Sequence, residues 1–118
     1  MEIILASQSP RRAQLMRQFG VDFRVVVGPA QEISHGEPQA TAAANALSKA
    51  ASVAEKYPQA LTIGADTVVV LDGRILGKPG DAQEAEAMLR ALSGRAHVVI
   101  TGVALCVGRK EARTFAVA

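Results

Sequence analysis

The fold is decided by residues 61–76, which read LTIGADTVVVLDGRIL. The first eleven are mostly apolar or β-branched, interrupted by Gly64 and by Asp66-Thr67, and such a run is typical of a buried strand. Asp72-Gly73 then separates this run from a second apolar stretch over residues 74–76, and Asp-Gly between two such runs is a strong hairpin signal. The stretch therefore predicts a long strand, a tight turn and a short returning strand.

The residues before the hairpin predict two units in which a strand precedes a helix. A short apolar run over residues 2–6 predicts a strand, and helical spacing then continues to residue 19. Ser9 is suited to cap that helix, Pro10 to its first position and Gly20 to its C-terminal end. A second strand is predicted over residues 22–27, a loop over 28–38 and an alanine-dense helix over 39–56. We expect the first helix to bury Leu15, Met16 and Phe19.

The residues after the hairpin predict a further helix and two more strands. Asp81 with Glu84 resembles a capping box, and Gly94 ends the helix that follows. Strands are predicted over residues 96–107 and from residue 114 to the end. The buried stripe of this helix is expected to consist of Ala85, Met88, Leu89 and Leu92. The pattern predicts one α/β domain over residues 1–118, whose last strand is cut short.

Composition bounds the class of protein. The chain has 118 residues, of which 49% are hydrophobic and 20% charged, so a disordered tail is excluded. No run approaches the length of a membrane-spanning helix and no secretory signal pattern occurs, so we expect a cytoplasmic protein with no membrane partner. The one cysteine, Cys106, excludes an internal disulfide and a structural zinc site, and is expected in the core. A net charge of +2 and the scarcity of aromatic residues argue against stable nucleic-acid binding.

Ser7, Ser9, Arg11 and Arg12 lie at the predicted turn from the first strand into the first helix. Free backbone N–H groups and the helix dipole favour an anion there, and the same dipole disfavours two arginines in the first turn unless an anion is bound. The segment is therefore a candidate phosphate site. The alternative is that Ser9 only caps the helix and both arginines point into solvent.

Asp66 is an acidic residue inside a stretch that otherwise reads as buried. A carboxylate there must be paired, bound to a metal or placed in a cleft, so Asp66 is a candidate general base or magnesium ligand. A strand-end carboxylate held by backbone hydrogen bonds is the alternative. Lys78 and Lys49 are candidate phosphate-binding cations and Glu32 a candidate second carboxylate for a metal, although each is also compatible with a solvated surface role.

Taken together, these segments resemble the Maf family of nucleoside triphosphate pyrophosphatases, once described as septum-formation inhibitors. The resemblance runs along the chain in order and is carried by residues 4–7, 9–12, 49–50, 63–69, 77–79, 92–95 and 101–103. It implies a Maf/ITPase-like fold with a mixed, twisted sheet flanked by helices. The family's C-terminal part, with its Asp-Lys-Ala-Gly-Ala-Tyr-Gly-Ile-Gln-Gly motif, is absent, so the resemblance covers the N-terminal portion of a family member.

The resemblance also implies a reaction and a set of residues. Family members convert a nucleoside triphosphate to the monophosphate and pyrophosphate with a divalent metal, commonly magnesium, with manganese or cobalt as alternatives. It implies Asp66 as proton acceptor, Glu32 as a second active-site acid, and Arg11 and Thr67 as positions that influence base choice. Its phosphate-site residues would be Ser9, Arg12, Lys49 and Lys78.

The aspartate followed by threonine at positions 66 and 67 resembles the branch that acts on dTTP and UTP. The branch that acts on 7-methyl-GTP remains an alternative, as does a nucleotide-binding or division-related protein without turnover. An RNA-binding module is the weakest reading. The uncovered edge of the last strand predicts that the chain self-associates, for example as a homodimer.

Overall fold

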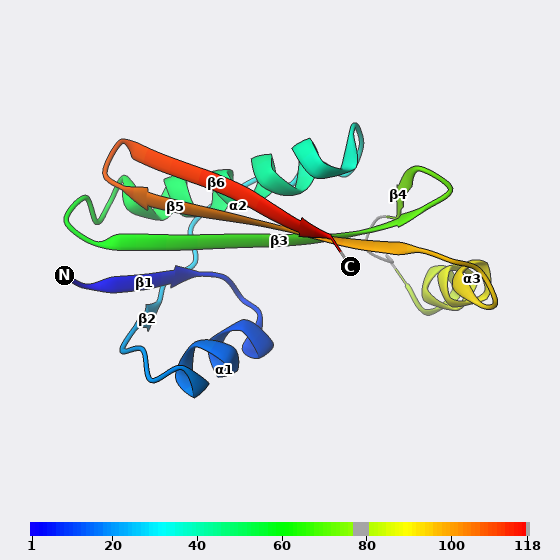
Figure 1. Cartoon of the computed structure of the whole chain (residues 1–118), viewed down its shortest axis with the longest axis horizontal. Helices are drawn as coiled ribbons and strands as arrows, with labels where there is room; N and C mark the ends of the chain where they lie inside the picture. Colours follow the sequence, from blue (N-terminus) through cyan, green and yellow to red (C-terminus); the bar gives the residue numbers. More distant parts are fainter. Residues whose placement is uncertain (77–80, 118) are drawn as a thin grey trace.

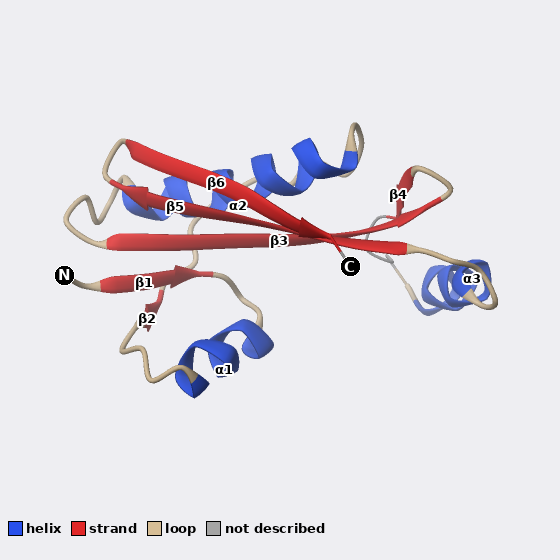
Figure 2. Ribbon diagram, viewed as in Figure 1, coloured by secondary structure: helices blue, strands red, loops and turns tan. Residues whose placement is uncertain are grey.

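The computed structural model describes residues 1–76 and 81–117, with only the backbone described from residue 113 onward. Within this part of the chain the elements are β1 (Ile3–Ala6), α1 (Pro10–Gln18), β2 (Arg24–Val25), α2 (Pro38–Ala54), β3 (Leu61–Leu71), β4 (Arg74–Leu76), α3 (Ala82–Leu92), β5 (Val98–Val107) and β6 (Lys110–Val117). They alternate along the chain as expected for an α/β protein, and Figure 2 shows how helices and strands are distributed.

The strands form one mixed sheet in the order β2-β1-β3-β5-β6, with β4 paired to β3. β1 runs parallel to both β2 and β3, whereas β5 is antiparallel to β3 and to β6. β3 is the long central strand in Figure 1; α1 lies near β1 and β2, and α2 runs along the other side of the sheet. The predicted α/β class with a mixed sheet flanked by helices is confirmed.

Helix α2 packs very close to the sheet because its inner face consists of small side chains. Ala46 and Ala50 are fully buried in the same core cluster as Ala104 of β5. Two strand glycines face this helix: a Cβ at Gly64 would lie 2.2 Å from the carbonyl oxygen of Ala46, and a Cβ at Gly102 would lie 2.4 Å from that of Ala42. Only glycine permits this close approach, so the helix backbone rests directly on β3 and β5.

The local signals read from the sequence are confirmed at the ends of the elements. The Ser9 side chain accepts a hydrogen bond from the Arg12 N–H at 3.4 Å, and Pro10 occupies the first turn of α1. Asp72 and Gly73 have φ of 53° and 77°, as a tight hairpin turn with both central residues left-handed requires. Asp81 accepts from the Glu84 N–H at 2.8 Å and caps α3.

The predicted buried stripes of two helices are only partly confirmed, because Met16, Ala85, Met88 and Leu92 are half-buried and the other predicted residues are exposed. In α1, Leu15 and Phe19 are 53% and 78% exposed, and in α3 no residue is buried and Leu89 is 69% exposed. Helical periodicity identifies which side chains share a face but not what covers that face. Here α3 lies at the end of the sheet beside β4, and α1 lies beside the short β1 and β2 (Figure 1), so neither helix is laid across the sheet as α2 is.

Several predicted boundaries also differ from the structure. The strand expected over residues 22–27 is reduced to Arg24–Val25, which pairs with Ile4 and Leu5 of β1. The strand expected from residue 96 begins at Val98, and the one expected from residue 114 begins at Lys110, since β6 pairs with β5 directly after the turn. β6 thus spans Lys110–Val117 in the described part of the chain.

Cys106 is buried in the core between α2 and the sheet, as expected. Burial, with a smaller contribution from the negative charge of Glu111, raises the pKa of the Cys106 thiol. The thiol therefore stays protonated at neutral pH and behaves as a small apolar side chain. In the described ranges, 1–76 and 81–117, no helix is both long and apolar enough to cross a membrane.

Candidate active site

The candidate site lies where β1 ends and β3 continues. β1 pairs with residues 61–64 of β3, and β4 pairs with residues 69–71 on the same edge. No strand of the described chain pairs with residues 65–68 on that edge, so Asp66 and Thr67 lie beside the gap. Successive residues of a strand point to opposite faces of the sheet. Asp66 accordingly faces α2 and Thr67 faces α1.

On the α1 side of the gap, Arg12 connects Ser7, which directly follows β1, to Thr67 of β3. Its guanidinium donates to the Ser7 hydroxyl at 3.3 Å and to the Thr67 hydroxyl at 2.7 Å. The Ser7 hydroxyl also accepts from the Ser9 N–H at 3.2 Å. The first turn of α1, its arginine and both serines are therefore held together at the end of β1, with their donors grouped where an anion would meet the helix dipole.

On the α2 side, one ammonium group connects two carboxylates. The Lys49 Nζ lies 2.7 Å from Glu32 Oε1 and 3.0 Å from Asp66 Oδ1. Asp66 is 5% exposed, so its charge is balanced inside the protein rather than by water. The expectation that a carboxylate in this strand must be paired is confirmed, and the partner is Lys49.

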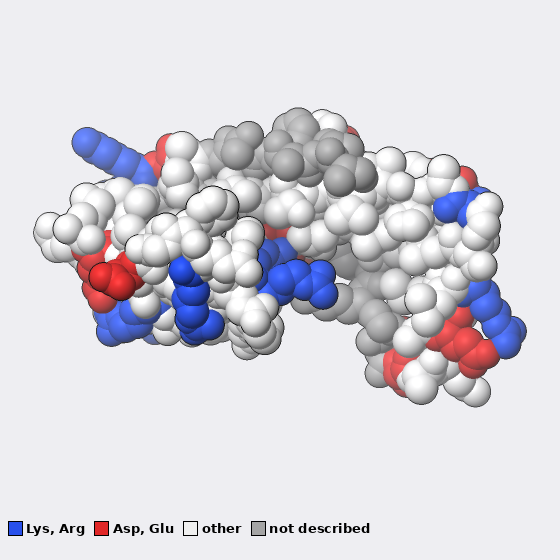
Figure 3. Space-filling model, turned by 60° about the horizontal axis from the view of Figure 1, so that its bottom comes forward, with Lys and Arg blue, Asp and Glu red and all other residues white. Residues whose placement is uncertain are grey.

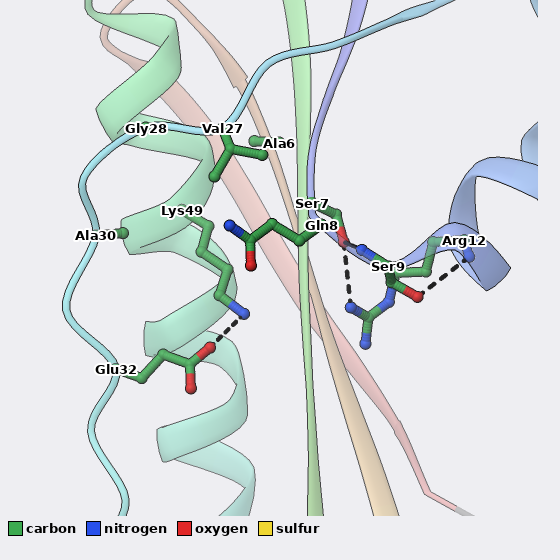
Figure 4. A pocket seen from close by; sticks show the side chains of 10 residues that line it. All are labelled: Ala6, Ser7, Gln8, Ser9, Arg12, Val27, Gly28, Ala30, Glu32 and Lys49. Carbon is green, nitrogen blue, oxygen red and sulfur yellow. Dashed lines mark hydrogen bonds and ion pairs between the residues drawn. The ribbon is translucent and has the colours of Figure 1, made fainter. Parts of the chain in front are cut away.

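The donors on the α1 side and the Lys49–Glu32 ion pair on the α2 side line one cavity of about 420 Å³. Figure 4 shows Ser7, Ser9 and Arg12 on one side of it and the Lys49–Glu32 ion pair on the other, with the Gln8 side chain projecting between them. Ala30 and Gly28 border the cavity from the chain segment between β2 and α2. Figure 3 shows basic side chains grouped near the middle of one face of the molecule, beside acidic ones. The cavity is thus lined by cations, hydroxyls and a carboxylate rather than by apolar side chains alone.

A second hollow, of about 750 Å³, lies on the α1 side of the gap. It includes Arg11, Arg12, Thr67 and Thr101 in its lining, and the hydroxyls of Thr67 and Thr101 lie 3.0 Å apart. Arg12 and Ser9 line both hollows, so the two are adjacent. Arg11 faces this second hollow and does not line the first.

The structure brings together most of the residues singled out in the sequence. Ser7, Ser9, Arg12, Lys49 and Glu32 line one cavity, and Asp66 is bonded directly to Lys49 behind it. Thr67 accepts a hydrogen bond from Arg12, which lines this cavity, and Arg11 lines the adjacent second hollow. Lys78 lies outside the described residues.

Two residues at the site were missed by sequence reasoning. Gln8 lines the cavity, and Asn45 is 3% exposed and donates to Asp66 Oδ2 at 3.0 Å. A signal for Asn45 was present: with Thr41 and Lys49 it forms a polar stripe at i, i+4 spacing on a helix that is otherwise rich in alanine.

Two carboxylates offer oxygen atoms to a divalent metal at this site. Glu32 and Asp66 share Lys49 as an ion-pair partner, and carboxylate oxygens are the donors that Mg²⁺ prefers. Among the residues that the structure describes, no group of three or more His, Cys, Asp or Glu side chains is placed to hold a metal ion. A metal here would therefore depend on other oxygen atoms, such as those of a bound phosphate.

Comparison with known proteins gives one family. A sequence profile described as "Maf-like protein" matches residues 2–118. Proteins named "dTTP/UTP pyrophosphatase" from Symbiobacterium thermophilum and Dictyoglomus thermophilum are each 50% identical to the chain, over 112 and 107 residues. These matches cover 93% and 88% of the chain but 58% and 55% of the two relatives. The chain therefore spans little more than half the length of the curated relatives it matches.

A solved structure also resembles this fold. The Ham1 protein of Staphylococcus aureus superposes with a TM-score of 0.62 over 99% of this chain and 69% of its own. The two sequences are 16% identical, so the comparison concerns the fold alone. It agrees with the ITPase-like architecture expected from the sequence.

Proposed function

This chain belongs to the Maf family, and from that premise we propose that it hydrolyses nucleoside triphosphates to the monophosphate and pyrophosphate. The observation that carries the proposal is the single cavity that joins the N-terminus of α1, with Arg12, to the Lys49 bridge between Glu32 and Asp66. The names of the relatives support the same reaction and favour dTTP and UTP as substrates. Because the chain spans little more than half of those relatives, activity and substrate remain proposals for it.

The phosphates would bind between the two ends of the cavity. A triphosphate carries several negative charges, and its hydrolysis is catalysed mainly by positioning and by neutralising charge. Ser7, Ser9 and Arg12 supply hydroxyl and guanidinium donors on one side, and Lys49 supplies an ammonium on the other. We assign Lys78 to the same phosphates on its resemblance to the family alone.

Asp66 is proposed as the base that orients and deprotonates water. The water would attack the α-phosphorus, the bond to the bridging oxygen would break, and pyrophosphate would leave with the electron pair. Lys49 fixes the direction of the Asp66 carboxylate by its hydrogen bond to Oδ1 at 3.0 Å. Proton transfer by a positioned carboxylate contributes roughly 10²- to 10⁴-fold to rate.

The donor set fits a divalent metal, most simply magnesium, with manganese or cobalt as alternatives. Glu32 and Asp66 would hold it, and phosphate oxygens and water would complete its coordination, as is usual for Mg²⁺ at phosphate sites. The metal would supply charge neutralisation and polarise the phosphoryl oxygens. Lys49, which now links both carboxylates, would remain beside it as a cation toward the phosphates.

Thr67 and Arg11 are proposed to influence the choice of base. Both line the second hollow next to the cavity, beside Thr101. Hydroxyl donors and acceptors at such a position discriminate between bases by the hydrogen bonds they satisfy. We infer a preference for dTTP and UTP over 7-methyl-GTP from Asp66-Thr67 and from the names of the relatives.

The wider setting is proposed on the family resemblance. We propose a cytoplasmic protein, a role in clearing unwanted nucleotides with a link to septum formation, and a single domain over residues 1–118 that corresponds to the N-terminal portion of longer relatives. A homodimer is proposed as well. Nucleotide is the proposed partner, with no membrane and no stable nucleic-acid complex.

Binding without turnover is the second candidate. It is favoured by the share of the relatives that the chain spans, 58% and 55%. A cavity that retains its cations but is open to water would bind phosphate while stabilising the transition state weakly, because charges act through a high dielectric there.

Pyrophosphate release from dTTP, UTP, 7-methyl-GTP and ATP distinguishes these proposals when nucleotide binding is measured in parallel. We expect release from dTTP and UTP, and a loss of about 10²- to 10⁴-fold in Asp66→Asn with binding retained. Asp22→Asn makes the same chemical change at an exposed aspartate outside the cavity and should leave release unchanged. Turnover by Asp66→Asn close to that of the wild type would remove Asp66 from the mechanism, and binding with no release by the wild type would favour the second candidate.

A further inference from the structure

Asn45 is a buried amide whose side chain makes three hydrogen bonds at the candidate site. Its Oδ1 accepts from the Ile33 N–H at 2.8 Å, and its Nδ2 donates to the Ile33 carbonyl at 2.8 Å and to Asp66 Oδ2 at 3.0 Å. The orientation of the amide is fixed by these partners, since a flipped amide would set N–H against N–H and oxygen against carboxylate. One side chain on α2 thus holds both a loop backbone and the Asp66 carboxylate.

The loop that Asn45 holds carries the second carboxylate of the site. Residues 28–37, here called the α2 loop, lie between β2 and α2 and contain Glu32, the residue directly before Ile33. The α2 loop is anchored again by Thr41, whose hydroxyl donates to the His35 carbonyl at 3.2 Å. Ile33 is held on both its N–H and its carbonyl, so Asn45 restrains the backbone directly beside Glu32.

The two Asp66 oxygens have different partners. Oδ1 accepts from the Lys49 ammonium and Oδ2 from the Asn45 amide. Two bonds from successive turns of one helix fix the plane of the carboxylate, which neither bond would do alone. A base must meet its water within hydrogen-bond reach and in the correct direction, so this orientation affects rate more than binding.

We propose that Asn45 is a positioning residue that couples the α2 loop to Asp66 and so sets the relative placement of the two carboxylates. This inference rests on the proposed hydrolysis for its kinetic consequence. Its structural part, the restraint of Ile33, is independent of any activity. Lys49 reaches the α2 loop through the Glu32 side chain only, and Thr41 bonds the loop without reaching Asp66, so among these bonds only those of Asn45 join the loop backbone to Asp66.

The kinetic test compares Asn45→Ala with Thr41→Val, which removes the other side-chain anchor of the α2 loop without touching Asp66. We expect Asn45→Ala to lower kcat by about 10- to 100-fold with KM changed less than about 3-fold, and Thr41→Val to change kcat by less than about 2-fold. In the Asp66→Asn background, Asn45→Ala should have little further effect, because Asn45 acts through that carboxylate. Equal losses in both backgrounds would overturn the proposal.

Asn45→Asp serves as a second variant of the same shape. It keeps an oxygen that accepts from the Ile33 N–H and removes the donors toward Asp66, so it should lower kcat while keeping Ile33 restrained. A kcat equal to that of the wild type would contradict the proposed orientation of Asp66.

Amide hydrogen exchange at Ile33 tests the restraint without any turnover. Exchange should accelerate by at least about tenfold in Asn45→Ala and stay unchanged in Thr41→Val and Asp66→Asn. Unchanged exchange in Asn45→Ala would overturn the inference. If the wild type releases no pyrophosphate, the proposed function fails, and this exchange measurement alone decides whether Asn45 restrains the loop.

Discussion

Replacing Gly64 with alanine should force α2 away from the sheet. The added Cβ would lie 2.2 Å from the Ala46 carbonyl oxygen and 2.9 Å from both the backbone nitrogen and the Cβ of Ala50, well inside van der Waals contact. The nearest atom belongs to a helix backbone, so no side-chain rotation relieves the clash. Overpacking of this kind costs about 1–3 kcal/mol, and at about 2.1 cal/mol/K per residue a chain of this length loses ~4 °C in Tm for each kcal/mol.

Thermal unfolding followed by circular dichroism measures this loss, and we expect Tm to fall by ~4–12 °C. Because α2 also carries Asn45 and Lys49, the displacement should weaken their bonds to Asp66 and lower pyrophosphate release. Asp22→Glu adds one carbon at an exposed position and should change stability by less than about 0.5 kcal/mol. Adding Ala50→Gly to Gly64→Ala should not restore stability, since it leaves the clash with the Ala46 carbonyl in place. An unchanged Tm in Gly64→Ala would refute the direct contact of α2 with β3.

Three further changes test the phosphate contacts, the choice of base and the length of the chain. Arg12→Ala removes the link between Ser7 and Thr67 and a donor toward phosphate, so affinities for dTTP, UTP and GTP measured by calorimetry should fall by similar factors; a loss confined to one base would contradict a phosphate role. Thr67→Val should change the ratio of dTTP to GTP hydrolysis by more than it changes the total rate, whereas a uniform loss would remove Thr67 from base choice. A chain extended to the length of its relatives should hydrolyse nucleotide faster per site than the 118-residue chain. Equal turnover by the two chains, together with a monomeric mass of the 118-residue chain by light scattering, would show that the cavity needs no further segment.

Local signals in the sequence predicted the local structure well. The apolar run over residues 61–71, the Asp72-Gly73 turn and the Ser9 cap depend on neighbours within a few positions, and all three are confirmed. The polar residues grouped at the start of α1 were identified for the same reason, because a strand followed by a capped helix is a local pattern. Pairing of Asp66 was predictable too, since a buried carboxylate requires a partner.

Contacts between distant segments could not be predicted in this way. The burial of Leu15, Phe19 and Leu89 was predicted wrongly because periodicity does not specify which surface covers a helix, and here these side chains are exposed. Asn45 was missed because its role depends on Asp66, 21 positions away, and on the backbone of Ile33. An asparagine in an alanine-rich helix has little meaning until the strand and the loop it joins are in place.

In the proposed reaction, water activated beside Asp66 attacks the α-phosphorus of a nucleoside triphosphate. Hydrolysis of dTTP by the chain in water enriched in ¹⁸O, followed by mass spectrometry of both products, shows which phosphorus is attacked. Attack at the α-phosphorus places one ¹⁸O atom in the thymidine monophosphate and none in the pyrophosphate, and we expect both products to be lost in Asp66→Asn. Label in the pyrophosphate, or release of orthophosphate in its place, would contradict it.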